Sequence, residues 1–310
     1  MRFGINGSSQ AMSGGARAVL ADMAAAEQED FSSYWVAQIG LLDALGVITA
    51  RGDTGSDMRL GTAVVSTWER HPHALATQAL TAQALVGDRL VVGIGVNHRP
   101  VVENGLHMDW DRPVRHVREY LDVLGDLLAT GAADRRGEIW SYTGESARPS
   151  ESVPSVMLAA LGPQMLEVAG RRTDGTILWC VGPKTVAGHI APRITEAAAA
   201  ADRPAPAIVC GLPVWVTDEP ERAREFLGRA LSIYAELPSY RAVLDREGVH
   251  GLGELSLVGS EDEVLDGIGA FAEAGVTDFT AVPMGAGDQG RARTRALLIR
   301  ARDEFAGPAD

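Results

Sequence analysis

One histidine in the sequence has both the chemistry and the position for proton transfer. His98 lies three residues after Gly95, in a polar turn that follows an apolar run at 90–96. An imidazole titrates near neutral pH and can therefore donate or accept a proton during a reaction. We predict a catalytic role for His98. The competing interpretation is an imidazole in an exposed surface loop.

A single lysine marks a second position. Of the 28 Lys and Arg residues only Lys184 is a lysine, and it follows Gly182 and Pro183 at the end of an apolar strand. Glycine lets a ligand approach the backbone, proline suits the first turn of a helix, and an ammonium group attracts phosphate. We predict that Gly182 and Lys184 bind a cofactor phosphate, the alternative being a solvated first-turn lysine. Gly162 and Pro163 form a similar turn one unit earlier, and the same role is predicted for them.

Two tryptophans and three further histidines lie in or near the same loops. Trp68 and Trp110 flank the same region of the sequence, and flat apolar walls suit aromatic or heterocyclic substrates. Core packing or a subunit interface explains either tryptophan equally well. His71 stands directly before a proline, which predicts a structural role at a helix start. His107 and His116 fall near polar, helical positions and are predicted to face solvent.

These residues need a scaffold that brings strand ends together, and the chain repeats one local pattern throughout. Apolar strands that end in small residues alternate with alanine-rich amphipathic helices, as in serial βα units around a parallel sheet. Eight strands are predicted, at 2–6, 33–36, 59–65, 90–93, 155–160, 176–179, 207–214 and 279–282. Eight such units favour a closed (β/α)8 TIM barrel, in which working residues lie at the C-terminal ends of the strands.

The chain is longer than a typical barrel of about 250 residues. We assign the surplus to two insertions, a polar one at 131–154 with Trp140 and Tyr142 in a short hairpin, and another at 237–258. Residues 1–310 are predicted to form a single barrel domain. An open doubly wound sheet is the alternative, but no glycine-rich dinucleotide fingerprint follows the first strand.

The composition argues against several classes of function. A formal net charge of -13 disfavours a broadly basic surface, so no nucleic-acid partner is predicted. The longest apolar run is far below the roughly 20 residues that span a bilayer, so no membrane partner is predicted. Only Cys180 and Cys210 occur, too few for a disulfide framework or a zinc site, which indicates a reducing cytoplasm and no metal.

Several short motifs follow one another along nearly the whole chain. They are the strand at 60–65 with Arg70-His71-Pro72 after it, the Gly93-Ile94-Gly95 turn followed by Glu103, Gly105, Arg112 and Glu119, the Gly162-Pro163 turn, and Gly182-Pro183-Lys184. This order resembles the bacterial-luciferase-like (LLM) superfamily of flavin and deazaflavin oxidoreductases. Within it, the His71-Pro72 helix start, the Gly162-Pro163 turn and the helix at 189–194 are most similar to the branch that uses coenzyme F420, an 8-hydroxy-5-deazaflavin.

The resemblance implies a ring-binding site on the third strand. Family members carry a non-proline cis peptide there, which by position joins Ala63 and Val64. Ala63, Val64 and Val65 are therefore expected to support the ring of F420, with FMN as the alternative cofactor, and Asn97 is expected to donate a hydrogen bond to it. Related sugar-phosphate dehydrogenases place a histidine where this chain has Gln38, so Gln38 is expected to orient the reactants by hydrogen bonding alone.

The sequence thus predicts an oxidoreductase that transfers a hydride between F420 and a small organic substrate. Reduction of an activated C=N or C=C bond is favoured, because the acid–base pair of the sugar-oxidising members is missing. Two alternatives stay open: an FMN-dependent monooxygenase that uses reduced flavin and O2, and a non-catalytic flavin-binding barrel. The resemblance also implies a homodimer.

Overall fold

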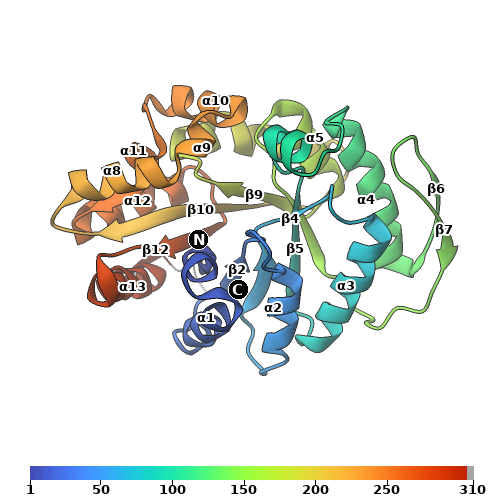
Figure 1. Ribbon diagram of the computed structural model, residues 1–310, viewed down its shortest axis with the longest axis horizontal. Helices are drawn as coiled ribbons and strands as arrows, with labels where there is room; N and C mark the ends of the chain where they lie inside the picture. Colours follow the sequence, from blue (N-terminus) through green and yellow to red (C-terminus); the bar gives the residue numbers. More distant parts are fainter. Residues whose placement is uncertain (306–310) are drawn as a thin grey trace.

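The computed structural model describes residues 1–305 and shows a closed barrel of parallel strands surrounded by helices (Figure 1). The strands, in the order in which they pair, are β1 (Arg2–Asn6), β2 (Ser33–Val36), β3 (Arg59–Thr62), β5 (Leu90–Gly95), β8 (Ser155–Leu158), β9 (Gly175–Trp179), β10 (Ala207–Val216) and β12 (Asp278–Pro283). Because β12 pairs in parallel with β1, the ring closes. The predicted eight-stranded barrel is confirmed, and the open sheet is excluded.

All eight predicted strands are present, and the third has an interruption that periodicity did not show. The segment predicted at 59–65 divides into β3 and a two-residue strand, β4 (Val65–Ser66), which pairs with β5. Between them the peptide bond from Ala63 to Val64 is cis, as the resemblance implied. The third strand is therefore interrupted at residues 63–64.

The helices pack their apolar faces against the outside of the barrel. The helices that connect successive barrel strands or follow the last one are α1 (Ser8–Gln28), α2 (Ala44–Arg51), α3 (Pro72–Leu85), α4 (Pro113–Thr130), α5 (Pro163–Arg172), α7 (Ala191–Ala199), α12 (Glu261–Glu273) and α13 (Gly287–Phe305). Shorter turns are η1 (Val101–Gly105), α6 (Pro183–Thr185) and η2 (Val186–Ile190). In α4, Val117, Leu121, Leu124 and Leu128 are buried at helical spacing. None of the helices within residues 1–305 is long and apolar enough to cross a membrane.

Both predicted insertions exist, and the second is longer than expected. The first contains an antiparallel hairpin of β6 (Ala132–Arg136) and β7 (Ser141–Glu145), which stands out beside α4 (Figure 1). The second begins earlier than position 237. It comprises α8 (Pro220–Ala230), α9 (Ser232–Ala235), α10 (Pro238–Glu247), α11 (Leu252–Leu255) and β11 (Leu257–Gly259). The short strand β11 was not predicted; it forms because β10 continues past the end of β9, whose pairing stops at Gly211, and so has a free edge at Val214–Val216.

Candidate functional site

The interior of the barrel is apolar and reaches the surface at the C-terminal ends of the strands. Its buried side chains form one cluster: Trp35, Val91, Met157, Ile177 and Val209. Three partly exposed small residues, Ala63, Val64 and Ala159, pack on this cluster directly after β3 and β8. We call these three residues the cup. In a (β/α)8 barrel this end carries the working residues.

Two glycines keep the cup shallow. A Cβ atom on Gly95 would lie 2.8 Å from Cγ2 of Val64 and 3.3 Å from the Cβ of Ala159, and a Cβ on Gly93 would collide with the carbonyl oxygen of Thr62. Any larger residue on this part of β5 would displace the cup. The arrangement leaves a low apolar floor of the kind that a planar ring can cover.

Gln38 is held by the loops beside the cup. Its amide nitrogen donates to Glu69 Oε2 at 2.9 Å, and its amide oxygen accepts from Arg70 Nη1 at 2.7 Å. Arg70 also donates to Asp43 Oδ1 at 2.8 Å. Both ends of the Gln38 amide thus have protein partners, which fixes its orientation. It is a hydrogen-bonding residue, as its type indicated.

His98 is a partly buried residue, unlike the exposed imidazole of the competing interpretation. Asn97 has a left-handed backbone (φ 60°), and its Oδ1 accepts from the backbone N–H of His98 at 2.8 Å. The imidazole packs edge-on against Tyr234 and Tyr240 of the second insertion, with centroid distances of 5.6 and 6.1 Å. Burial lowers the pKa of His98, so the neutral imidazole, which can accept a proton, predominates at neutral pH.

The start of α6 already has a carboxylate beside it. Glu247, a buried residue, accepts from the backbone N–H of Thr185 at 2.6 Å, and its main-chain oxygen accepts from Lys184 Nζ at 2.9 Å. A Cβ on Gly182 would collide with the same carboxylate. A phosphate bound by Gly182 and Lys184 would therefore compete with Glu247. Their cofactor role stays a prediction.

The start of α5 is more open. The helix begins at Pro163, with Gly162 as its N-terminal cap residue, and no described side chain caps it. A Cβ on Gly162 would meet nothing within 4 Å. His189 contacts this turn through Leu161, whose carbonyl oxygen lies 2.9 Å from His189 Nε2. Free backbone N–H groups at a helix start favour an anion.

Trp68 and Trp110 lie together, with ring centroids 5.7 Å apart. His116, which was predicted to face solvent, is fully buried and stacks on Trp68 at 3.9 Å. That prediction was wrong because the insertion hairpin covers this face of α4 with Trp140. His71 has the structural role predicted for it, since its Nδ1 accepts from the backbone N–H of His73 at the start of α3.

Burial lowers the pKa of His116 to about 4, a shift opposed by its hydrogen bond with Thr67 and by the charge of Glu119. Its usual value is about 6.5. Between these values the unfolded chain binds a proton that the folded chain does not, so the stability contribution present at neutral pH is lost as pH falls. We expect His116→Gln to reduce the drop in unfolding free energy between pH 7 and pH 4.5 by about 2 kcal/mol. Urea titrations of both proteins at the two pH values would check this, and parallel curves would contradict it.

Three residues near the mouth were missed by the sequence analysis. Asn6 and Trp179 are the last residues of β1 and β9. Their position at strand ends could have marked them as candidates from the sequence. Asn6 accepts from the backbone N–H of Ser8 at 3.0 Å, and Trp179 lies beside Gly211 inside the barrel. Glu247 gave no signal, because its contact with α6 depends on how the insertion folds.

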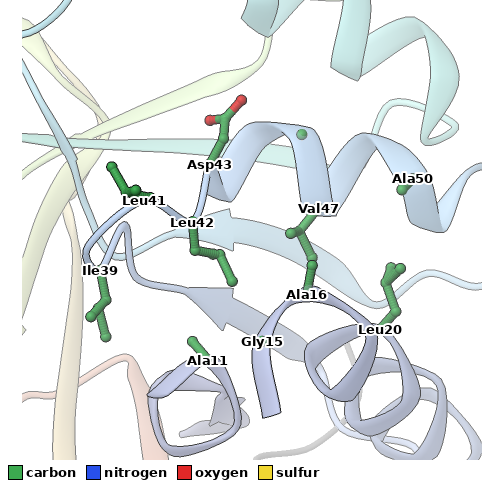
Figure 2. A pocket seen from close by; sticks show the side chains of 11 residues that line it. Ala11, Gly15, Ala16, Leu20, Ile39, Leu41, Leu42, Asp43, Val47 and Ala50 are labelled. Carbon is green, nitrogen blue, oxygen red and sulfur yellow. The ribbon is translucent and has the colours of Figure 1, made fainter. Parts of the chain in front are cut away.

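One hollow of the structure lies outside the barrel. It is an apolar groove of about 580 Å³ between α1, the loop at 39–43 and α2 (Figure 2). Asp43 is the one ionisable residue in its lining, and Arg70 binds that carboxylate. The groove shares no lining residue with the cup. Within residues 1–305, no group of three or more His, Cys, Asp or Glu side chains is placed to hold a metal ion.

Comparisons with known proteins agree with the barrel. A family model described as luciferase-like monooxygenase matches residues 1–278. A Mycobacterium tuberculosis protein named as a candidate coenzyme F420-dependent oxidoreductase is 30% identical over 168 residues, covering 49% of this chain and 48% of that protein.

Two solved structures have the same fold at low identity. The coenzyme F420-dependent tetrahydromethanopterin reductase of Methanopyrus kandleri superposes with a TM-score of 0.80 at 20% identity, covering 97% of both chains. The oxygenating constituent of 3,6-diketocamphane monooxygenase from Pseudomonas putida, solved with FMN, has a TM-score of 0.77 at 15% identity. It covers 100% of this chain and 99% of that one.

Proposed function

The chain belongs to the luciferase-like monooxygenase family, and we propose that it is an oxidoreductase that exchanges a hydride between coenzyme F420 and a small organic substrate. The reaction we favour is reduction of an activated C=N or C=C bond. The observation that carries the proposal is the cup of Ala63, Val64 and Ala159 at the catalytic end of the barrel. Its glycine-lined floor suits a flat tricyclic ring.

The residues around the cup have the properties that this reaction needs. When bound, the deazaflavin supplies the hydride. Asn97 would hydrogen-bond the ring, and Gln38, fixed by Glu69 and Arg70, would orient the reactants. His98 would hold or deliver the proton that accompanies the hydride. Trp68 and Trp110 would form an aromatic wall for the substrate.

We propose the start of α5, at Gly162 and Pro163, as the site of the cofactor phosphate. The support is its open backbone, in contrast to the start of α6, where Glu247 competes. We therefore expect Lys184→Ala to change the Kd for F420 by less than about threefold, under 1 kcal/mol. Equilibrium dialysis would measure it. Tenfold weaker F420 binding in a variant with unchanged thermal stability would instead indicate that Lys184 binds the phosphate.

A second candidate function is an FMN-dependent monooxygenase. It is favoured by the fold similarity to the FMN-bound Pseudomonas putida protein. The cup gives no reason to exclude it, because the flavin and deazaflavin rings have the same flat shape.

Cofactor-dependent turnover would separate these functions. Purified protein would be given reduced F420 or reduced FMN together with a panel of imines and enones, with and without O2. We expect tight binding of F420 and anaerobic oxidation of reduced F420 by an acceptor. Turnover with reduced FMN only when O2 is present would instead identify a monooxygenase. Binding without turnover across the panel would favour a non-catalytic barrel.

A further inference from the structure

Four aromatic rings follow one another in a row that begins with the two tryptophans of the predicted substrate wall. In order they are Trp110, Trp68, His116 and Tyr120, and we call them the ring ladder. Neighbouring centroids are 5.7, 3.9 and 6.1 Å apart, and neighbouring planes are within 30° of each other. Trp110 at one end is partly exposed, whereas Tyr120 at the other end is fully buried. The ladder therefore runs from the surface into the core between the barrel and α4.

The hairpin insertion closes the ladder from the side. Trp140 meets His116 and Tyr120 edge-on, at centroid distances of 5.3 and 5.4 Å and interplanar angles of 75° and 88°. Edge-on contacts of this kind are favourable because the positive ring edge meets the negative ring face. His116 is thus enclosed by Trp68 on one face, Tyr120 on the other and Trp140 at the side.

Among the described residues, His116 is the one ladder residue whose ring has a hydrogen-bond partner. His116 Nε2 lies 2.9 Å from Thr67 Oγ1, next to Trp68 in the sequence. The buried ring atoms without a hydrogen-bond partner in residues 1–305 include Trp68 Nε1, His116 Nδ1, Tyr120 Oη and Trp140 Nε1. The orientation of Trp68 therefore depends on ring contacts, and the shortest of these is with His116.

We propose that His116 is a positioning residue that fixes the plane of Trp68, so that Trp68 and Trp110 present one rigid aromatic wall to a flat substrate. The wall's use by a substrate rests on the proposed function, whereas the positioning of Trp68 does not. His116 acts through Trp68 and Thr67 rather than by touching the reacting atoms. Buried polar atoms without a hydrogen-bond partner are costly. Apolar side chains would fill this part of the core without that cost, so the polar rings found here fit a need for flat rings.

Circular dichroism tests the positioning without cofactor or substrate. Two indoles that lie close together at a fixed tilt, as Trp68 and Trp110 do, give an exciton couplet in the far ultraviolet, and the part lost in Trp110→Phe belongs to this pair. We expect His116→Gln, which can keep a hydrogen bond to Thr67 but loses the ring, to reduce that part by more than about half. Tyr120→Phe keeps the ring and loses a hydroxyl that has no partner, so it should keep the couplet. An unchanged couplet in a folded His116→Gln protein would overturn the proposal.

Kinetics test the use of the wall. Menadione is a flat aromatic quinone that takes up a hydride and a proton to give a hydroquinone, and 2-cyclohexen-1-one is a non-aromatic enone whose activated C=C bond takes up a hydride and a proton. With reduced F420, we expect His116→Gln to raise KM for menadione about tenfold, with kcat and both constants for cyclohexenone within about twofold of wild type. An equal rise in KM for both acceptors would overturn the proposal that the wall binds a flat substrate. If wild type reduces neither these acceptors nor any of the panel of imines and enones, the proposed function fails, and the couplet still decides whether His116 positions Trp68.

Discussion

Replacing Ala159 with phenylalanine is expected to abolish binding of F420 and of FMN while the protein stays folded. Ala159 is partly exposed on the cup, and its Cβ lies 3.3 Å from where a side chain on Gly95 would begin. A benzyl group added there would occupy the apolar floor that a tricyclic ring must cover. Because most of the ring's contact area would be lost, we expect Kd to rise by more than about 100-fold, roughly 3 kcal/mol. Equilibrium dialysis with each cofactor would measure it.

The chain offers a matched control at the other end of the barrel. Ala207, at the start of β10, is also partly buried and packs on the same interior cluster as Ala159. Ala207→Phe therefore makes the same change in volume next to the same interior cluster, but at the N-terminal ends of the strands. We expect its Kd to stay within about threefold of wild type. Equal loss of binding in both folded variants would mean that the cup is not the ring site.

Replacing Asp278 with alanine is expected to lower the unfolding free energy by about 3 kcal/mol, because it removes the buried carboxylate at the centre of a partly exposed charge cluster. Asp278 is 1% exposed at the start of β12. Its two carboxylate oxygens accept from Arg2 at 2.9 and 2.8 Å, and it also pairs with Arg59. The cluster therefore joins β12, β1 and β3 at the N-terminal ends of the strands. Without Asp278, the Arg59 guanidinium would be left partly buried without this partner. Guanidinium chloride titration at pH 7 would give the value.

An exposed ion pair provides the comparison. Asp288 pairs with Arg291 but is 96% exposed, so Asp288→Ala should lower the unfolding free energy by less than about 1 kcal/mol.

The pKa of Asp278 predicts how its contribution to stability depends on pH. Burial raises this pKa, but the Arg2 hydrogen bond and the Arg59 charge together bring it below its usual 3.8. Its stabilising effect is therefore complete above that value and is lost as pH falls through the lower folded-state pKa. Asp278→Asn should approach wild-type stability only below about pH 3.8; an unchanged gap there would contradict the assignment.

Much of the fold could be predicted because each βα unit carries its own local pattern. Alternating apolar strands and amphipathic helices located all eight strands, and the motif order indicated the cis bond between Ala63 and Val64. The second insertion was harder to place. Its helices α8 and α9 precede the predicted start, and β11 spans only Leu257–Gly259, too short a run to show a period of its own.

The candidate site was predicted in part. Position at a strand end pointed to Gln38, Asn97 and His98, and the structure places them at the mouth of the barrel, with Gln38 and His98 held by contacts from other loops. Residue type suggested a phosphate role for Lys184, but its type could not reveal Glu247 beside it. That carboxylate comes from a distant helix, and partners of this kind depend on packing.

The sequence by itself determined the barrel, its family and the end of the barrel that we propose as the reaction site, because these follow from local periodicity and from motifs that stay in order along the chain. The tertiary structure alone decided the environment of each side chain. The sequence predicts that His116, at a polar helical position, faces solvent. It is buried because a hairpin from another part of the chain covers it. Burial, pKa and hydrogen-bond partners are set by residues far apart in sequence, and no local pattern encodes them.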